Sequence, residues 1–448
     1  MTSKDFIVTP FVLLIIYVVA YLVRPKFTDN VTKRYFIPGL TVKIFGALAV
    51  GFIYQFYYDG GDTFNFYNDS KLIWKAFLES PMKAFKLIFL ASGTHFPDTY
   101  IYSSQMHFYN DSASYMVVCI AAFFGLFTFN TYSSIAVLFA ATCYIGVWSL
   151  YQIFYFLYPA LHRKIALAIL FIPTVFFWGS GIFKDTITFG CLGVLTYALY
   201  KIFIRKESLV INAIILVISF WFIYKIKVYI LLSFLPSIVI WVVSKNLSLI
   251  KLKFVKYTIM PLVIILAFVI SYHGLIAVSQ YDPRYSFEQI ATTAKITAYD
   301  IAFFSGRDAG STYVLGEMDG TFSGLLTLGP QAINVALFRP YLWEVKNPLM
   351  LLSALEALIF LYFTIKTILS RWFLSIIKHV FKPEVLFCLT FALTFAFATG
   401  ISTYNFGSLS RYKIPMIPFY LLSLFIIQHN LSQTIKYQDK TKKLVRLY

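Results

Sequence analysis

The sequence predicts an all-α polytopic membrane protein, a transmembrane helical bundle whose external loops carry interfacial helices. Of its 448 residues, 59% are hydrophobic and only 13% are charged. Apolar runs of about 20 residues recur along the chain, the length that a helix needs to cross a hydrocarbon core of ~30 Å. No internal repeat or low-complexity linker divides the chain. We therefore expect one transmembrane domain, residues 1–448, with about 11 spans.

The expected spans follow the apolar runs in order. The first run, FIVTPFVLLIIYVVAYLV, is too long for a signal peptide and ends in RPKF instead of a small-residue cleavage site, so we expect it to be retained as a helix. A further apolar stretch, ASYMVVCIAAFFGLFTF at 113–129, either crosses the membrane or lies in its interface. The other runs lie near residues 37–57, 131–157, 165–182, 186–203, 208–224, 228–244, 257–272, 348–368, 384–403 and 412–428, after the first at 6–23.

The distribution of basic residues predicts the orientation. Lys and Arg accumulate in cytoplasmic loops of membrane proteins. If 113–129 stays in the interface, the basic loop 24–36 and the basic C-terminal tail both lie in the cytoplasm, and loops 58–130 and 273–347 are external. If 113–129 crosses, loop 24–36 becomes external, and this alternative stays open. We expect a multi-pass protein of the plasma (inner) membrane with a cytoplasmic C-terminus.

Composition also excludes several function classes. The formal net charge of +18 follows the topology signal, so no nucleic-acid partner is expected. The chain contains no P-loop, dinucleotide fingerprint, zinc-protease motif or nucleophile elbow. The four cysteines lie in apolar runs without ligand-like spacing, which predicts neither disulfides nor a zinc site: Cys119, Cys143, Cys191 and Cys388.

The first candidate site is the stretch YYDGGDTFNFYND, which follows the expected span at 37–57. Two glycines allow a sharp turn and a close approach to a ligand. Asp59 or Asp62 could act as a general base or hold a divalent cation such as Mg or Mn. The alternative is that the motif is only a turn. Five aromatic residues here form either an interfacial belt, which we favour, or a surface that stacks on sugars: Tyr58, Phe64, Phe66, Tyr67 and Trp74.

The second candidate site is FIPTVFFWGSGIFKDTITFG, where two apolar runs meet at Lys184 and Asp185. Charge close to the hydrocarbon is costly and is usually retained for pairing or for function. Asp185 therefore needs Lys184, a metal ion or a substrate proton nearby. The alternative is a local contact between Lys184 and Asp185 that only ends the helices.

The third group consists of external basic residues. Arg411 and Lys413 in NFGSLSRYKIPMIPFY stand at the outer end of the last span, where they suit a lipid phosphate or snorkel from a helix end. Glu356, within an apolar span, serves either a proton relay or an interhelical hydrogen bond. The remaining candidates for phosphate contact are Lys225, Lys227, Arg339 and, in the long external loop, Arg307.

The order of these motifs resembles the GT-C class of integral membrane glycosyltransferases, which includes protein O-mannosyltransferases and aminoarabinose transferases. The resemblance implies that Asp62 or Asp59 is the first-loop catalytic carboxylate and that Asp185 is the second acidic residue. SRYKIPMIP is similar to the Arg-Tyr-Pro pattern of such enzymes, where a basic residue meets the lipid phosphate. The sequence departs from the class in its additional first span, in a GGD motif without the Asp-Glu pair, and in the lack of a large soluble domain after the last span.

These observations together predict a membrane glycosyltransferase. It would move a sugar from a polyprenyl-phosphate-linked donor to an acceptor on the external face, without a certain cofactor but with room for a divalent cation at Asp62 and Asp185. Asp62 would activate the acceptor, while Arg411, Lys413 and Lys184 would stabilise the departing phosphate. One alternative is a polysaccharide polymerase or ligase that depends on paired arginines. The others are a transporter of a lipid-linked glycan and a membrane scaffold.

Overall fold

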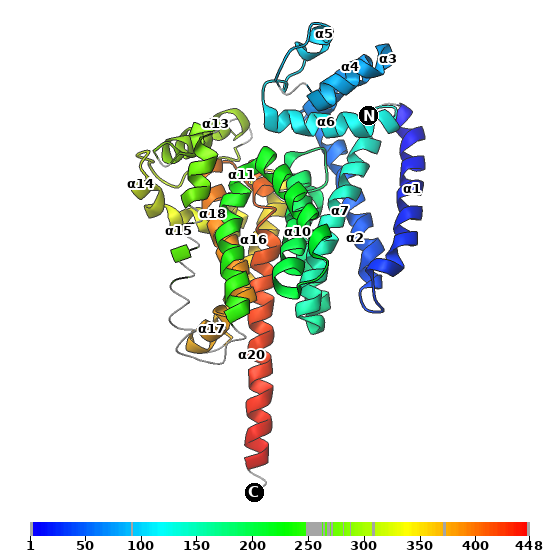
Figure 1. Cartoon of the computed structure of the whole chain (residues 1–448). Coiled ribbons are helices and arrows are strands. Elements are labelled where there is room, and N and C mark those ends of the chain that lie inside the picture. The colour runs from blue at the N-terminus through cyan, green and yellow to red at the C-terminus, as the bar shows by residue number, and fades with distance from the viewer. Residues whose placement is uncertain are drawn as a thin grey trace. The chain divides into compact units, whose positions relative to one another are not determined.

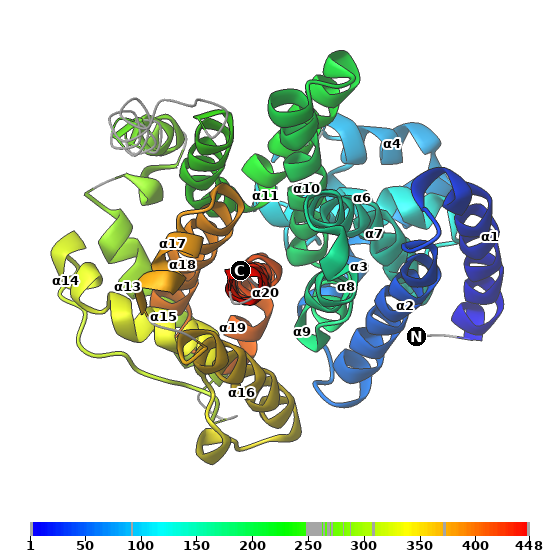
Figure 2. The same cartoon turned by 90° about the horizontal axis from the view of Figure 1, so that it is seen from below.

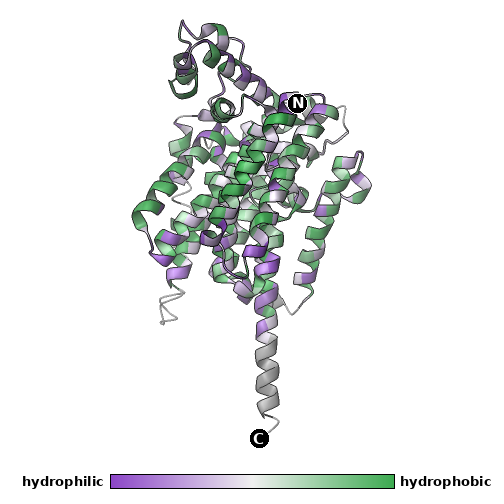
Figure 3. Ribbon diagram, turned by 90° about the vertical axis from the view of Figure 1, so that its right-hand side faces the viewer, coloured by the Kyte–Doolittle hydropathy of each residue, from purple (hydrophilic) through white to green (hydrophobic). Residues whose placement is uncertain are grey.

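The computed structural model describes residues 3–445, except 91–92, most of 248–271, 281, 287, 307–309 and 371–372. Within these residues the elements are helices, and an isolated antiparallel bridge joins Thr312 and Asn405. Figure 3 shows hydrophobic residues along most of each long helix. The prediction of an all-α helical membrane protein is confirmed.

Seven helices in the described part of the chain are long and apolar enough to cross a membrane. An eighth candidate is the pair α19 (Phe406–Tyr412) and α20 (Ile417–Val445), whose apolar part is bent by 68°. The chain is therefore a multi-pass membrane protein. The seven are α1 (Ser3–Phe27), α2 (Lys33–Phe56), α7 (Tyr132–Leu157), α10 (Lys184–Leu199) with η3 (Tyr200–Arg205), α11 (Leu209–Leu247), α16 (Pro348–Ile368) and α18 (Pro383–Thr403).

Three expected spans differ from the observed helices, and a fourth falls largely outside the described residues. The run at 165–182 is not one helix but α8 (His162–Leu170), α9 (Pro173–Phe177) and a non-helical turn. Pro173 explains the first break, because a proline disfavours helical backbone at the residue before it. The runs at 208–224 and 228–244 form α11, which contains non-helical backbone at Lys227 (φ −148°, ψ 74°). The run at 257–272 lies mostly outside the described residues.

The contacts divide the chain into two compact units. No linker in the sequence predicts this division. Unit 1 comprises Met1–Phe156 and Ile169–Val228, and unit 2 comprises Leu157–Ala168 and Tyr229–Tyr448. Each unit is described by itself below.

Unit 1 contains α1, α2, α7 and α10, and polar contacts anchor its first helix. Figures 1 and 2 show α1 beside α2. Buried Asp5 accepts a hydrogen bond from the backbone N–H of Ser133 at 2.8 Å, near the start of α7. Helices α7 and α10 approach closely, because a Cβ on Gly146 would lie only 1.8 Å from the carbonyl oxygen of Gly190. Small residues at such contacts let transmembrane helices pack backbone to backbone.

A layer of shorter helices, α3 (Asp62–Glu79), α4 (Pro81–Phe85), α5 (Tyr100–Ser103) and α6 (Ser112–Phe127), covers one end of unit 1. Figure 1 shows α6 lying across the ends of the spans instead of alongside them. Its 16 residues measure about 24 Å, short for a crossing. This position agrees with the alternative in which 113–129 lies in the interface. Asp69 ties the layer together by accepting the backbone N–H groups of His107 and Phe108 at 3.0 and 2.8 Å.

The aromatic residues singled out in loop 58–130 are mostly packing residues. Phe66 and Tyr67 are 3% and 5% exposed and belong to the core of this layer. The ring of Phe64 stacks on Tyr132 with centroids 4.4 Å apart. For Phe66 and Tyr67, both an interfacial belt and a free sugar-stacking surface are therefore wrong, whereas Phe64 is only partly buried. Tyr58 is 46% exposed.

Unit 2 is built around α18, which packs against α15 (Gly329–Phe338) and α20 (Figure 2). A Cβ on Gly400 would lie 2.1 Å from the carbonyl oxygen of Ala332, so α18 and α15 touch through their backbones. The break between α18 and α19 pairs with the loop 273–347. There the N–H of Tyr313 donates to the carbonyl of Tyr404 at 3.1 Å, and the N–H of Phe406 donates to that of Ser311 at 2.9 Å.

Candidate functional site

The GGD motif makes a tight turn between α2 and α3. Asp59, Gly60 and Gly61 have φ values of 52°, 126° and 117°, in the region that favours glycine. Gly61 faces the ring of Tyr54, which a Cβ on Gly61 would approach within 2.8 Å. Asp62 is the first residue of α3, and both Asp59 and Asp62 are exposed.

Tyr54 brings the first acidic motif together with the second. Its ring contacts Phe183 at 5.6 Å and Trp178 at 6.3 Å between centroids. Phe183 directly precedes Lys184, and Gly61 directly precedes Asp62. The two motifs therefore pack against one tyrosine, although 122 residues separate Lys184 from Asp62. Tyr54 belongs to none of the motifs in the sequence, and its place six residues before the first of the two glycines is its sole local signal.

The second motif carries two ion pairs to other parts of unit 1. The ammonium of Lys184 lies 3.2 Å from the carboxylate of Asp111. Asp185 is buried and lies 2.5 Å from the ammonium of Lys227. Lys184 and Asp185 were alternatively expected to contact each other and only end the helices. In the structure, each instead forms an ion pair with a residue elsewhere in unit 1. Both pairs bridge separate elements, and both partners come from parts of the chain that the local sequence does not reveal.

Asp111 caps helix α6 as well as pairing with Lys184. Its carboxylate accepts the N–H of Ala113 at 3.2 Å and the hydroxyl of Ser114. Burial raises the pKa of Asp111, but the hydrogen bond from Ser114 and the charge of Lys184 outweigh it and place that pKa below the usual value. Asp111 is thus a stable anion that holds Lys184 at the end of α6.

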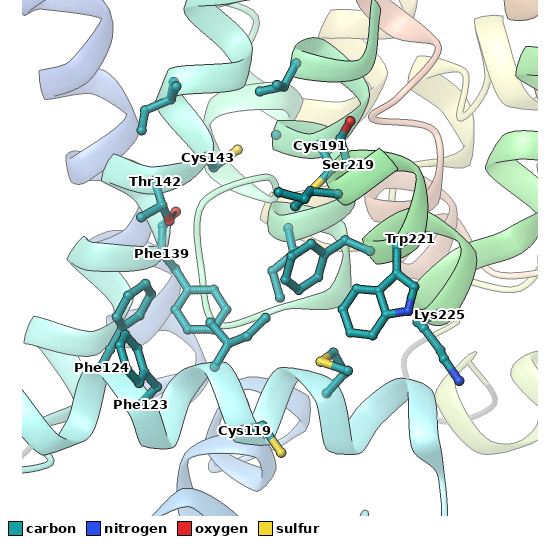
Figure 4. A pocket seen from close by; sticks show the side chains of 18 of the residues that line it. Cys119, Phe123, Phe124, Phe139, Thr142, Cys143, Cys191, Ser219, Trp221 and Lys225 are labelled. Carbon is teal, nitrogen blue, oxygen red and sulfur yellow. Dashed lines mark hydrogen bonds between the residues drawn. The ribbon is translucent and has the colours of Figure 1, made fainter. Parts of the chain in front are cut away.

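A large apolar cavity lies within unit 1 against α6 (Figure 4). Its volume is about 1020 Å³, and α6, α7, α10 and the first part of α11 line it. Most of the lining is apolar, as with Phe123, Phe139 and Trp221, whereas Lys225 brings a cation to the lining. Lys225 is exposed, so its ammonium is not enclosed among the apolar side chains of the lining. A cavity of this character suits an amphiphile with a hydrocarbon chain and an anionic head group.

The remaining basic candidates belong to unit 2, where each has partners of its own. Arg339 forms an ion pair with Glu344 through a bond from Nε at 3.0 Å, and its guanidinium lies 5.5 Å from the ring of Phe406. Lys413 is 1% exposed and lies 6.0 Å from the ring of Phe360.

Arg411 is half-buried near the end of α19, and Arg307 lies outside the described residues. Glu356 is buried within α16 and interacts electrostatically with Lys413. The expected group of external basic residues is therefore divided between the two units. Lys184, Lys225 and Lys227 accompany Asp59, Asp62 and Asp185 in unit 1.

Among the residues that the structure describes, no three His, Cys, Asp or Glu side chains gather as a metal site. A Mg or Mn ion held by Asp62 or Asp185 therefore stays a prediction, and it would require ligands from the substrate in addition to these carboxylates. Comparison of the chain with protein-family models, with curated proteins and with solved structures finds no match.

Proposed function

We propose that this protein is a membrane glycosyltransferase that moves a sugar from a polyprenyl-phosphate-linked donor to an acceptor on the external face of the plasma (inner) membrane. The observation that carries the proposal is the apolar cavity of about 1020 Å³ with Lys225 in its lining. An apolar space within a membrane protein accepts a hydrocarbon chain, and a cation at its edge attracts a phosphate. Such a lipid would present its head group at the end of unit 1 that carries the acidic motifs.

Lys184 and Lys225 would bind the phosphate of the donor. Ser112, the neighbour of Asp111 in the sequence, lines the cavity. Ile187, one helical turn after Lys184, lines it as well. The pair of Asp111 and Lys184 is therefore adjacent to the cavity. Lys184 keeps 25% of its side-chain exposure in this pair, so a phosphate can reach its ammonium.

Asp62 would act as the general base. It removes the proton from an acceptor hydroxyl while the acceptor oxygen bonds to C1 of the sugar and the bond from C1 to the phosphate oxygen breaks. The lipid phosphate leaves with the electron pair of that bond, and Lys184 and Lys225 stabilise its charge. Asp185, paired with Lys227, would fix the start of α10 instead of taking the proton. In this scheme the C-terminus is cytoplasmic and the first loop is external.

The proposal is tested with the purified full-length protein in lipid nanodiscs. Radiolabelled polyprenyl-phosphate mannose, glucose and aminoarabinose are offered as donors, with total membrane glycans as acceptors. We expect Lys184→Gln to lower transfer at least 10-fold, whereas Lys71→Gln, which changes a cation on α3, leaves it within 2-fold of wild type.

Two results would count against the proposal. Wild-type protein that consumes none of the donors would exclude transfer of these sugars. Equal activity of Lys184→Gln and Lys71→Gln would remove the phosphate-binding role. The polymerase or ligase would be favoured if the protein transferred preassembled oligosaccharide and lost this activity on substitution of Arg339 and Arg411. The transporter would be favoured if the protein flipped lipid-linked glycan across the membrane without consuming it.

A further inference from the structure

Lys43, in the middle of the transmembrane helix α2, is a buried cation to which the proposed mechanism gives no role. It is 2% exposed. A charged group at this depth is expensive and usually marks a function or a specific partner. In the sequence, Lys43 lies inside the expected span at 37–57 and belongs to none of the candidate motifs.

The hydrogen bonds of Lys43 go to the backbone of a broken helix. Its ammonium donates to the carbonyl of Val175 at 3.4 Å and, in a shorter bond, to the carbonyl of Gly179. The ring of Phe189 lies 5.6 Å from the same nitrogen. Cys143 of α7 also interacts with Lys43, and its thiol donates to the same carbonyl of Gly179 at 3.8 Å. In the described part of the chain no carboxylate forms a salt bridge with Lys43.

The backbone that Lys43 contacts has a particular need for a donor. Helix α9 ends at Phe177, α10 begins at Lys184, and the residues between them, 178–183, are all buried. Non-helical backbone at membrane depth must find partners inside the protein, because lipid supplies none. Part of this need is met locally, since the hydroxyl of Thr186 donates to the carbonyl of Gly181 at 2.7 Å. Lys43 supplies donors from another helix.

Other residues of α2 hold the same segment. A Cβ on Gly46 would lie 2.1 Å from the carbonyl oxygen of Phe176, so α2 touches the end of α9 through its backbone. Two turns later, Tyr54 packs on Trp178 and Phe183. One face of α2 thus contacts the buried segment at several successive turns of the helix. The GGD turn, which leads to Asp62, follows directly after α2.

We propose that Lys43 is a positioning residue, which clamps the buried segment 178–183 to α2 and so keeps Lys184 and Asp185 in register with Asp62. Gly179, the acceptor of the clamp, stands five residues before Lys184. The catalytic consequence rests on the proposed function, whereas the clamp itself does not. Simple packing of α2 would not require an ammonium at this position, because an apolar side chain of similar length would fill the space.

The test compares Lys43→Met with Lys33→Met, an exposed lysine at the start of the same helix, in nanodiscs. Hydrogen exchange reports on the clamp without any substrate. We expect the amides of 178–183 to exchange at least 10-fold faster in Lys43→Met, with α7 unchanged, and neither to change in Lys33→Met. In the transfer assay, Lys43→Met should lower kcat about 10- to 100-fold with KM within about 3-fold, the effect of a misplaced rather than missing group.

Two further variants keep the test decisive if Lys43→Met does not fold. Gly46→Ala pushes α2 away from Phe176 while keeping the lysine, and it should raise exchange at 178–183 in the same way. Lys43→Arg retains donors and should recover exchange and kcat toward wild type.

The clamp would be overturned if the amides of 178–183 exchanged at the wild-type rate in Lys43→Met. If Lys43→Met does not fold, the same result in Gly46→Ala would overturn it. Faster exchange with wild-type kcat would overturn its link to catalysis. Faster exchange in a protein whose wild type transfers no sugar would support the clamp and separately reject the proposed function.

Discussion

The ion pair of Asp185 and Lys227 provides the most quantitative prediction. The two charged atoms lie 2.5 Å apart, and the side chains keep only 2% and 8% of their exposure. Solvent therefore screens the pair little, unlike a surface pair. Removing one partner from a buried pair leaves the other charge uncompensated, which typically costs ~3–5 kcal/mol.

We expect Lys227→Met to lower the free energy of unfolding by about 3–5 kcal/mol. Asp185→Leu should cost a similar amount, for the same reason. The double variant buries no charge of the pair and should recover most of the loss, to within about 2 kcal/mol of wild type. Lys225→Met, an exposed lysine two residues away, should change stability by no more than ~0.5 kcal/mol.

The assay is reversible unfolding in mixed micelles, followed by circular dichroism for the wild type, the two single variants and the double variant. Their double-mutant cycle isolates the interaction of the two side chains. Losses below about 1 kcal/mol that simply add in the double variant would contradict a buried pair, and would mean that water reaches both groups.

Three other predictions concern different parts of the molecule. Val194→Trp should fill the cavity and reduce the amount of lipid that copurifies, measured by native mass spectrometry. An unchanged amount of lipid would refute the binding of a lipid in the cavity. Gly146→Leu should abolish the monodisperse folded species in size-exclusion chromatography, because helix α7 could no longer approach α10, and a normal elution profile would contradict that contact. Burial raises the pKa of Glu344, but the hydrogen bond from Arg339 outweighs it and lowers that pKa, so the stability that Glu344 contributes is complete above the unfolded pKa of about 4.3. Acid should therefore change the fluorescence of nearby Trp343 only below about pH 4, and Glu344→Gln should remove this transition; a transition at higher pH would refute the depressed pKa.

Local chemistry explains which parts of the site the sequence could predict. Two adjacent glycines after an apolar helix predict a tight turn, and both have the positive φ that such a turn requires. Lys184 and Asp185 attract notice because charges between apolar runs are costly. Their partners could not be predicted in the same way, because Asp111 precedes Lys184 by 73 residues and Lys227 follows Asp185 by 42.

Hydropathy alone misleads where polar backbone is buried. The run at 165–182 is apolar throughout, so it resembles a span, but it contains Pro173 and the glycines of the turn before Lys184. These residues interrupt the helix, and Lys43 donates to two of the buried carbonyls, those of Val175 and Gly179. A lysine inside an apolar run was the one sequence signal for this arrangement, and its acceptors become visible only in three dimensions.

The central claim is that Asp62, an exposed carboxylate in unit 1, is the base of a sugar transfer. The most direct measurement is the rate at which folded protein consumes radiolabelled polyprenyl-phosphate sugar in the presence of acceptor, for the wild type, Asp62→Asn and the nearby control Asp59→Asn. We predict consumption by the wild type and by Asp59→Asn, and a loss of at least about 100-fold in Asp62→Asn. Equal consumption by Asp62→Asn and the wild type would contradict the assignment of Asp62 as the base.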